Sequence, residues 1–494
     1  YSVLVIEKGK HYNAKDFPKT NWNLRKWLWL PSLRFFGFFK MTFYKHVGVL
    51  SGVGVGGGSL VYANTLPKPK TEFFNSGNWA GICDWEKELS AHYSTAETML
   101  GAVKNPKLFD SDNTLGAVAE AFNKENAFEP TKVAVYFGEV EKTVPDPFFN
   151  GEGPDRAGCT FCGACMTGCR HNAKNTLDKN YLYLAGKKGA ELMAEKEVIR
   201  VIPADSADGS GGYFIDYKSS TSFLFKKHER VNTKGVIFAG GVLGTVRLLL
   251  NMKSSHLPNL SKHVGNFIRT NNESLVLVTS RQKQKKFSEG VAIGSILQVD
   301  QNSHLEPVRY GSGSGFWKLM GVPLVHGKNM FTRFFKLIFT FFSHPLAYLK
   351  IYFVRDFASR SVILLYMQNL DSTIRFRRGI FNLKSTMSEG KAPTAFMKEA
   401  KDLADKTAEI IEGKPMVLAT EALTGIPTTA HILGGAVIGS TAEEGVVDSN
   451  QKVFGYENMY VCDGSAVSAN PGVNPSLTIT AMSERVMGKI KDKV

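Results

Sequence analysis

The sequence predicts an α/β fold, and three stretches carry that prediction. Residues 1–6 are a short β-branched apolar run of the kind found in buried parallel strands. Residues 51–64 place five glycines within seven positions and then continue into an apolar segment. Residues 235–241 repeat the buried-strand pattern, end in glycines and precede a helical pattern over 243–252. Because ligands of doubly wound sheets bind beyond the carboxyl ends of such strands, the two glycine-rich ends are the expected ligand site.

The first strand ends in an acid, Glu7. In a dinucleotide-binding βαβ unit, an acid at the end of the second strand bonds the ribose hydroxyls, about 20 residues after a Gly-x-Gly-x-x-Gly turn. No such turn precedes Glu7, so we expect the sequence to lack roughly 25 to 35 N-terminal residues, by that spacing. A signal peptide would be lost with them; a cytoplasmic or peripheral membrane location is the expectation. Glu7 could also be only a strand-end acid.

The glycine run, Gly52 to Gly58, suits an anion. Glycine reaches positive φ freely, and successive N–H groups of such a turn form a concavity for a pyrophosphate. The alternative is a flexible linker, but linkers of this kind are usually polar, whereas residues 60–62 are apolar.

Composition limits the function classes. At 494 residues the chain predicts two or more domains, and 43% apolar residues argue against disorder. The net charge of +15 fits nucleic acid or an anionic membrane surface. Since the chain has no arginine-rich tract and no zinc-finger spacing, we expect membrane contact and no nucleic acid.

Other elements follow from local patterns. Asp84 is placed to cap a helix over 85–100, and strands are expected at 197–202 and 213–217. Residues 23–47 mix aromatic and basic side chains, which suits either a membrane interface or a core with snorkelling cations. Residues 333–355 are the most aromatic part of the chain and predict an interfacial segment, a lid or an ordinary buried helical pair. A charged amphipathic pattern predicts a helix over 396–412.

The C-terminal region holds the candidate catalytic side chains. His431 precedes two glycines, and Asp463 follows a predicted strand over 459–462. Asn474 before Pro475 fits an N-cap with proline at the first helical position. The start of that helix would offer free N–H groups and a positive dipole end.

Together, the glycine run with His431, Asp463 and Asn474 resembles the glucose–methanol–choline flavin oxidoreductases, most closely their cholesterol-oxidase-like branch. The resemblance covers nearly the whole chain and is strongest at residues 54–61, 174–181 and 463–481. It implies FAD as cofactor, with His431 as the base and Asn474 as the group that orients the substrate hydroxyl. A purely structural histidine and a simple helix cap remain the alternatives. The FAD contacts that the resemblance implies are Glu7, Gly54, Gly56, Gly57, Gly58, Ser59, Asn64, Val198, Ala239, Gly240, Asp463, Gly464, Asn474 and Pro475.

The expected architecture is an FAD/NAD(P)-binding Rossmann-like domain with an inserted mixed-sheet α+β substrate domain. The predicted cofactor domain comprises residues 1–66, 170–275 and 428–494, without its first βα unit. The predicted substrate domain comprises residues 67–169 and 276–427.

The resemblance implies hydride transfer to flavin from the CH–OH group of a bulky apolar alcohol, a sterol or a long-chain alcohol. Oxygen or another acceptor would then take the electrons. A dehydrogenase feeding a quinone or a protein acceptor, and a non-catalytic lipid-binding flavoprotein, are the alternatives. Steroid oxidases of this kind that shift a double bond use an additional carboxylate. The comparable strand, residues 362–369, offers no acid, so no isomerisation is expected and cholesterol is disfavoured.

Four cysteines form a separate motif. Cys159, Cys162, Cys165 and Cys169 have the spacing of a bacterial iron–sulfur site, although Arg170 stands where proline is usual. A cluster, a zinc site or a loop with free thiols would each fit, and no metal is the main expectation.

Overall fold

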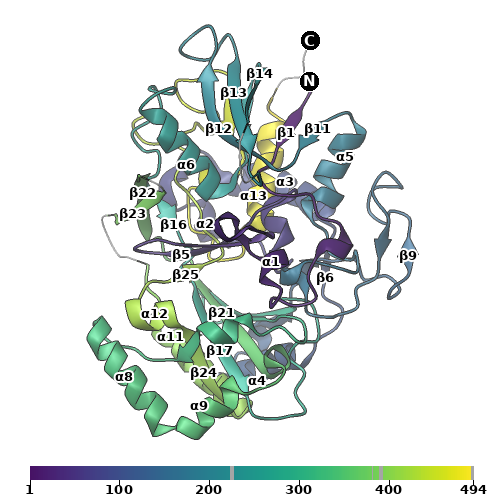
Figure 1. Cartoon of the computed structure of the whole chain (residues 1–494), viewed down its shortest axis with the longest axis vertical. Coiled ribbons are helices and arrows are strands. Elements are labelled where there is room, and N and C mark those ends of the chain that lie inside the picture. Colours follow the sequence, from purple (N-terminus) through teal and green to yellow (C-terminus); the bar gives the residue numbers. More distant parts are fainter. Residues whose placement is uncertain (223–226, 381, 389–392, 491–494) are drawn as a thin grey trace.

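A computed structural model describes residues 1–222, 227–380, 382–388 and 393–490. The molecule has two parts that follow one another along its long axis (Figure 1). One part carries several small sheets and the termini, and the other is built on a seven-stranded sheet. Helices and sheets mix in both parts, so the predicted α/β class is confirmed.

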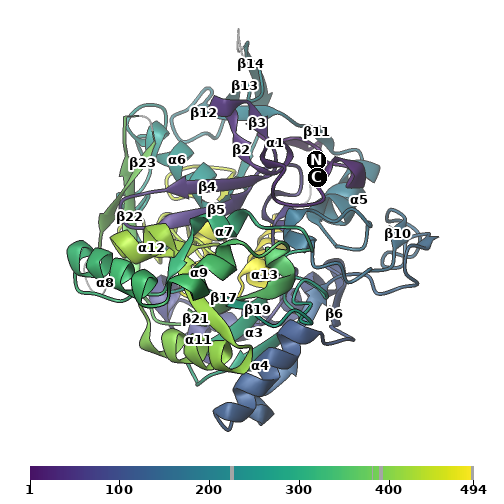
Figure 2. The same cartoon turned by 60° about the horizontal axis from the view of Figure 1, so that its bottom comes forward.

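The large sheet has strand order β20-β24-β17-β21-β19-β18-β7, and its neighbouring strands are antiparallel. Its strands are β7 (Phe128–Pro130), β17 (Ser274–Ser280), β18 (Ser295–Gln298), β19 (Ser303–Val308), β20 (Gly321–Pro323), β21 (Ser361–Gln368) and β24 (Gly413–Leu418). Apolar residues of α4 (Asp110–Ala121) and α11 (Lys398–Ile410), such as Val118 and Leu403, form one core with this sheet. The helices α8 (Met330–Ser343) and α12 (Ala419–Thr424) lie beside β20, an edge strand of the sheet, and α9 (Pro345–Tyr352) follows α8 (Figure 2).

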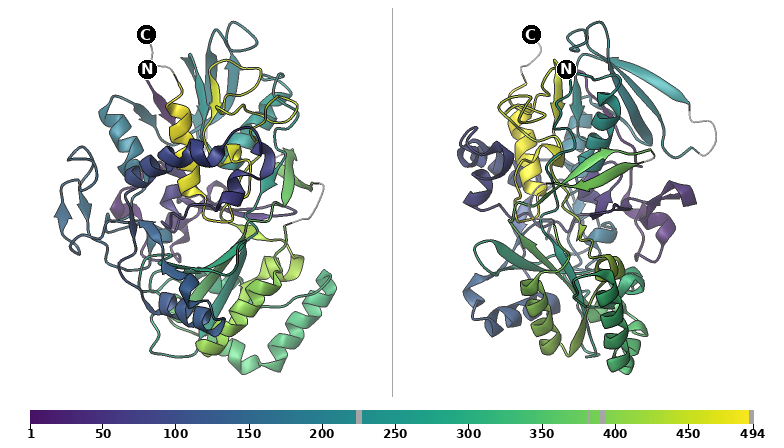
Figure 3. Two further views of the ribbon diagram at one scale, coloured as in Figure 1. Left: turned by 180° about the vertical axis from the view of Figure 1, so that it is seen from behind. Right: turned by 90° about the vertical axis from the view of Figure 1, so that its left-hand side faces the viewer.

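The other part contains two parallel strand pairs, as the buried-strand patterns predict. β1 (Leu4–Ile6) pairs with β11 (Glu191–Met193), and β15 (Val236–Phe238) pairs with β26 (Met459–Val461). An antiparallel sheet of β12 (Lys196–Pro203), β13 (Tyr213–Ser219) and β14 (His228–Thr233) extends beyond them. The main helices here are α3 (Trp85–Met99), α5 (Tyr181–Lys187), α6 (Gly241–Lys253) and α13 (Ser476–Met487), which Figure 3 shows from two further sides.

Short elements connect the two parts. Two three-stranded sheets combine β4 (Phe39–Phe43), β5 (Gly48–Gly52) and β25 (Thr428–Thr429), and β16 (Ile268–Arg269), β22 (Thr373–Arg378) and β23 (Leu383–Met387). The remaining short helices and strands are α1 (Leu24–Trp27), α2 (Thr71–Phe74), α7 (Phe316–Met320), α10 (Phe357–Arg360), β2 (Trp29–Leu30), β3 (Phe35–Phe36), β6 (Ala102–Lys104), β8 (Lys132–Ala134), β9 (Thr143–Val144) and β10 (Arg156–Ala157).

Most local predictions are confirmed. The strands expected at 197–202 and 213–217 are β12 and β13, and the helix expected over 396–412 is α11. Asp84 caps α3 by accepting a hydrogen bond from the Lys87 N–H (3.1 Å). In the aromatic segment 23–47, Trp27, Trp29, Phe38 and Phe39 are buried, as the core interpretation requires, whereas Leu33 and Phe43 are exposed.

The N-cap predicted for Asn474 is wrong. Helix α13 begins at Ser476, so Pro475 occupies the cap position and no side chain caps the helix. The Asn474 amide instead bonds a carboxylate on another strand (3.2 Å). The Asn474 side chain is therefore turned to the carboxylate of the site described below.

Packing places α3 with the cofactor side of the molecule. The Tyr93 hydroxyl bonds that of Thr478 on α13 (2.8 Å), and Glu88 pairs with Arg485 (3.0 Å). The predicted domain boundaries, which put 67–169 with the substrate domain, remain a prediction. Residues 223–226, 381, 389–392 and 491–494 of the predicted domain ranges lie outside the described residues.

Candidate active site

His431 is held by a buried carboxylate, Glu273. Its Nδ1 lies 2.7 Å from Oε1 of Glu273, and its side chain is 14% exposed. The Thr429 hydroxyl and the Ala430 N–H donate to Glu273 at 2.8 and 3.0 Å. Both carboxylate oxygens are thus engaged, which fixes the orientation of the imidazole. In the part of the chain that the structure describes, Nε2 of His431 has no hydrogen-bond partner, so it is the nitrogen available to a substrate.

The environment also sets the charge of His431. Burial lowers the pKa of the imidazole, but the Glu273 carboxylate outweighs it and Glu306 adds to the effect, so the net pKa is raised. A neutral His431 donating Nδ1–H to Glu273 would present a basic Nε2 to a hydroxyl proton. The Glu273 carboxylate would then stabilise the imidazolium that results.

Asn474 meets a second buried carboxylate, Glu306. Nδ2 of Asn474 donates to Oε2 of Glu306 (3.2 Å), and Nε2 of His304 lies 3.5 Å from Oε1. Among the described residues, Oε1 of Glu306, Oδ1 of Asn474 and Nε2 of His304 are buried without a hydrogen-bond partner. Buried polar atoms are nearly always paired, so these orphaned atoms mark a place where a ligand belongs.

Strand register brings the two carboxylates to one side of the large sheet. Glu306 on β19 lies opposite Leu365 on β21, and Leu365 lies opposite Leu275 on β17. Residues that face each other across strands share a face, as do residues two apart. Glu273, two residues before Leu275, therefore lies on the same face as Glu306. Leu365 packs with Ala63 beside the glycine run, so this face is turned to the cofactor side.

Sequence reasoning missed both carboxylates. The strand compared in the sequence, β21, has no acid, as predicted, but the neighbouring strand β19 supplies Glu306, so the argument against isomerisation loses its basis. The signal in the sequence is weak, because β19 mixes polar and apolar residues and Glu306 stands out only as an acid between Leu305 and Pro307. Glu273 likewise precedes an apolar strand directly.

The glycine run leaves room for a cofactor. A Cβ added to Gly57 or Gly58 would meet no atom within 4 Å, and Gly57 has φ +55°. Gly54 packs closely instead, and its N–H donates to Glu7 Oε1 (3.1 Å), which also accepts from Gly9 (2.6 Å). Burial raises the pKa of Glu7. The geometry joins Glu7 to the glycine loop, as a dinucleotide site requires, and the open side at Gly57 and Gly58 fits a flat ring system.

The carboxyl ends of the parallel strands β15 and β26 meet. Thr245 connects them, since it accepts from the Gly240 N–H (3.2 Å) and donates to Asp463 (2.5 Å). The other oxygen of Asp463 accepts from the Ser465 N–H (2.8 Å), and burial raises its pKa. Both oxygens serve the protein, so Asp463 shapes this edge of the site. Gly464 touches the loop after His431 through its carbonyl, which accepts from Gly434 (2.9 Å).

The other predicted contacts lie around the same loop. Ser59 donates to the Gly56 carbonyl (2.6 Å) and accepts from the Leu177 N–H (2.9 Å). Asn64 is buried at φ +63°, with both amide atoms unpaired among the described residues. Val198 lies on β12. The first residue of that strand, Lys196, donates its N–H to the Glu7 carbonyl (2.9 Å). Ala239 follows β15 directly, and Pro475 precedes α13.

Lys174 ties the glycine loop to the cysteine loop. Its buried ammonium donates to the carbonyls of Leu60, Tyr62 and Cys165 at 3.1, 2.9 and 2.9 Å. Burial lowers its pKa to about 7. This clamp explains why the 174–181 motif accompanies the glycine run.

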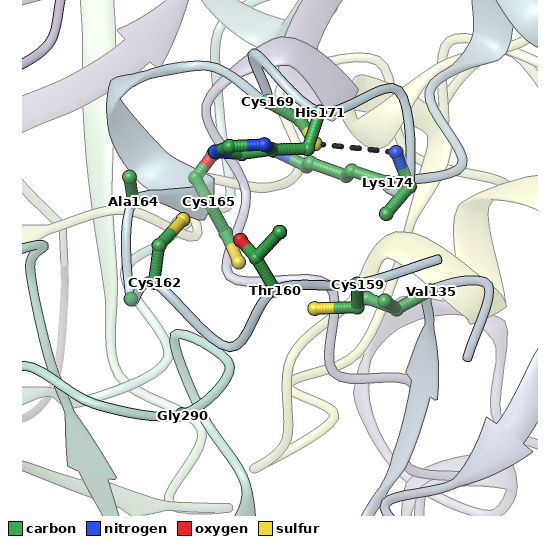
Figure 4. A pocket seen from close by; sticks show the side chains of 12 residues that line it. Val135, Cys159, Thr160, Cys162, Ala164, Cys165, Cys169, His171, Lys174 and Gly290 are labelled. Atoms are coloured by element: carbon green, nitrogen blue, oxygen red, sulfur yellow. Dashed lines mark hydrogen bonds between the residues drawn. The ribbon is translucent and has the colours of Figure 1, made fainter. Parts of the chain in front are cut away.

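The four cysteines line one cavity of about 20 Å³ (Figure 4). All are free thiols. Burial raises the pKa of Cys159 and Cys165, whereas for Cys169 Lys179 and backbone N–H groups outweigh burial and lower the pKa. Across the described ranges, no set of three or more histidine, cysteine or acidic side chains is arranged to hold a metal. The loop with free thiols remains a prediction for this motif.

Comparisons with known proteins agree with this geometry. Two family models described as GMC oxidoreductase match residues 37–267 and 368–483. A cholesterol oxidase of Acinetobacter baumannii is 44% identical over 503 residues, covering 100% of this chain and 90% of the relative. A cholesterol oxidase of Mycobacterium tuberculosis is 39% identical, covering 98% of this chain and 86% of the relative.

More distant matches fit as well. A long-chain-alcohol oxidase of Arabidopsis thaliana is 24% identical, covering 100% of this chain and 64% of the relative. Pyridoxine 4-oxidase from Mesorbium loti has a similar fold, with a TM-score of 0.61 and 11% identity over 99% of this chain and 94% of that one. The space at the glycine loop and the orphaned polar atoms fit FAD and an alcohol, and the flavin would supply the acceptor for a hydride. The chain belongs to the GMC oxidoreductase family and is an FAD-dependent alcohol oxidoreductase acting on CH–OH groups.

Proposed function

We propose that this protein oxidises the hydroxyl of a 3-hydroxysteroid and then moves a neighbouring ring double bond into conjugation with the new carbonyl, with oxygen as the electron acceptor. The observation that carries the proposal is Glu306, a buried carboxylate beside Asn474 with one oxygen that accepts no hydrogen bond and lies 3.5 Å from Nε2 of His304. An alcohol oxidation alone needs one base, and His431 supplies it. A second, under-bonded carboxylate in the same site suits a second proton transfer.

The residues divide the chemistry between them. Nε2 of His431 would accept the hydroxyl proton while the carbinol carbon loses its hydride. Asn474 would hold the same oxygen, since Nδ2 donates one hydrogen to Glu306 (3.2 Å) and has a second hydrogen to donate. Glu306 would then remove a proton from the carbon between the carbonyl and the double bond, and return it to the far end of that double bond. The net second step moves one proton and consumes nothing.

Similarity supports the steroid and the acceptor. The two relatives with the highest identities given above bear the name cholesterol oxidase. The absence of a metal-holding group among the described residues gives no support to an electron path through the cysteine loop. The long-chain alcohol is the competing substrate, since one distant relative carries that name.

The test compares two substrates and two proteins. Anaerobic addition of a 5-ene-3-hydroxysteroid to the FAD-loaded protein should bleach the flavin faster than a long-chain primary alcohol does, and air should restore the colour. The product should show conjugated-enone absorbance. Glu306→Gln, which keeps the shape of the side chain, should still bleach but release the unconjugated ketone.

Two results would overturn parts of the proposal. If the primary alcohol bleached the flavin faster, the steroid assignment would be wrong. If Glu306→Gln formed the enone at the wild-type rate, Glu306 would have no part in isomerisation. Restoration of the colour only by a quinone, and not by air, would exclude oxygen.

A further inference from the structure

Helix α8 has its apolar face turned to solvent. Its large apolar side chains recur at three- and four-residue intervals, which on a surface helix normally mark the face that packs on the core. Here these side chains are exposed, up to 75% at Phe339. The exposed stripe consists of Met330, Phe331, Phe334, Phe335, Ile338, Phe339 and Phe342.

The inward face of α8 packs Leu337 and Phe341 on the core and carries a buried cation, Arg333. Arg333 is buried, and its guanidinium donates to the carbonyls of Leu423 (3.2 and 3.1 Å) and Gly327 (3.0 Å). The same group stacks over the Phe396 ring at 5.3 Å. Because Arg333 fixes the rotation of the helix, the outward stripe is a built feature rather than a free orientation. Leu423 belongs to α12, which precedes the segment that carries His431.

The following helix continues the exposed surface. Leu346 and Leu349 of α9 and Phe353 just after it are exposed, Phe353 to 81%, while Tyr348 and Ile351 anchor α9 in the core. Both helices lie at the outer edge of the part that is built on the seven-stranded sheet, away from the termini (Figures 1 and 3). We call residues 330–353 the α8–α9 hairpin. Continuous exposed apolar surfaces of this kind mark interaction sites.

Charge identifies the partner. No Asp or Glu occurs between Glu306 and Asp356, whereas Lys328, Lys336, Lys350 and Arg355 are exposed in or beside the hairpin. Three of the four acids of the adjacent α11, Asp402, Asp405 and Glu409, are each paired with a lysine of the same helix, and the fourth, Glu399, is exposed. An aromatic face rimmed by unopposed cations matches the interface of an anionic bilayer, where aromatic rings sit at headgroup depth and basic groups meet lipid phosphates.

We propose that the α8–α9 hairpin inserts its exposed aromatic face into an anionic lipid surface and holds the protein there as a peripheral membrane enzyme. Among the described residues, no helix is long and apolar enough to cross a bilayer. The contact is therefore with one leaflet. The proposal deepens the proposed function, since it names the phase from which an apolar alcohol would be taken.

Binding of the FAD-loaded protein to sterol-free vesicles tests the proposal independently of any oxidation. The wild type should sediment with vesicles of phosphatidylcholine and phosphatidylserine, and less with phosphatidylcholine alone. Phe335→Glu with Phe339→Glu should lower partitioning about tenfold or more, because charged side chains insert poorly. Lys336→Glu with Lys350→Glu should weaken binding only to the anionic vesicles.

A matched control separates the hairpin from surface hydrophobicity in general. Ile380→Glu removes an apolar side chain that is 86% exposed in the turn after β22, and it should bind as the wild type does. Each variant is checked for flavin absorbance and melting temperature. A wild type that does not sediment, equal binding to both vesicle types, or hairpin variants that bind as the wild type would overturn the proposal. So would a lipid-free dimer that the phenylalanine variants dissociate in the absence of vesicle binding, which would make a second copy the partner.

Discussion

The active site holds two buried carboxylates on one sheet face, and their surroundings differ. Glu273 accepts from Thr429 and Ala430 and contacts His431, so both its oxygens are engaged. Glu306 has Asn474 on one oxygen and no hydrogen bond on the other. A fully bonded carboxylate is fixed and positions its neighbour, whereas an under-bonded one is free to take a proton. The comparison assigns Glu273 to support His431 and leaves Glu306 for chemistry of its own.

The largest effect is expected at His431, which contacts Glu273 and feels the charge of Glu306. His431→Ala removes the base, and the rate of flavin reduction by alcohol should fall about 10³-fold, within the usual range for general-base catalysis. Stopped-flow absorbance measures it, with bound FAD as the control for folding. A loss below tenfold would mean that another group takes the hydroxyl proton.

Glu273→Gln tests the supporting role. Loss of the orienting carboxylate should cost about 10- to 100-fold in kcat. The base must be neutral to act, so activity rises with pH through the pKa of His431, which Glu273 helps to raise. The acidic limb of the kcat/KM profile should therefore move to lower pH in the variant. A profile that stays in place would show that Glu273 does not set the charge of His431.

Both roles require flavin over the glycine loop, and Gly58→Val tests that placement. The added side chain enters open space without backbone strain, so the fold should persist while FAD affinity falls about tenfold or more, because the valine takes up cofactor space. Gly186→Val on α5 is the matched control, since its Cβ also meets no atom within 4 Å. Equal FAD affinity of the two variants, measured by fluorescence titration, would contradict the assignment.

The smallest effect concerns a third buried acid, Glu421, which feels the charge of Glu273. Burial raises its pKa to about 8, so the folded protein keeps a proton that the unfolded chain loses above about pH 4.5. Stability should thus fall as pH rises between these values. Glu421→Gln, which can still accept from the Thr428 N–H (3.0 Å), should raise the free energy of unfolding near pH 8 and change it little at pH 4.5. Equal gains at both pH values would exclude this titration as the cause.

Local pattern determined much about this protein. The β-branched runs, the glycine-rich strand ends and Asp84 are short-range signals, and each formed the element that it predicts. His431 and the glycine loop were also identified from sequence, since a motif keeps its residues close along the chain. One prediction for the aromatic run at 333–355 was a buried helical pair. The pair forms as α8 and α9, but much of its apolar surface is exposed. The spacing of the aromatic residues predicts an apolar face and not the direction in which that face points.

Only the tertiary structure decided the rest. Glu273 and Glu306 share a face because β17, β21 and β19 pair in a particular register, and register is a long-range property that no local pattern contains. Asn474 does not cap α13; its amide donates to Glu306, a residue far away in the chain. The rotation of α8 was likewise set by Arg333 bonding carbonyls of another helix and loop. The sequence predicts which residues carry chemistry at the glycine loop and at His431. Strand pairing and helix docking depend on contacts between distant segments, and they decided which acids lie near these residues and which apolar face meets the outside.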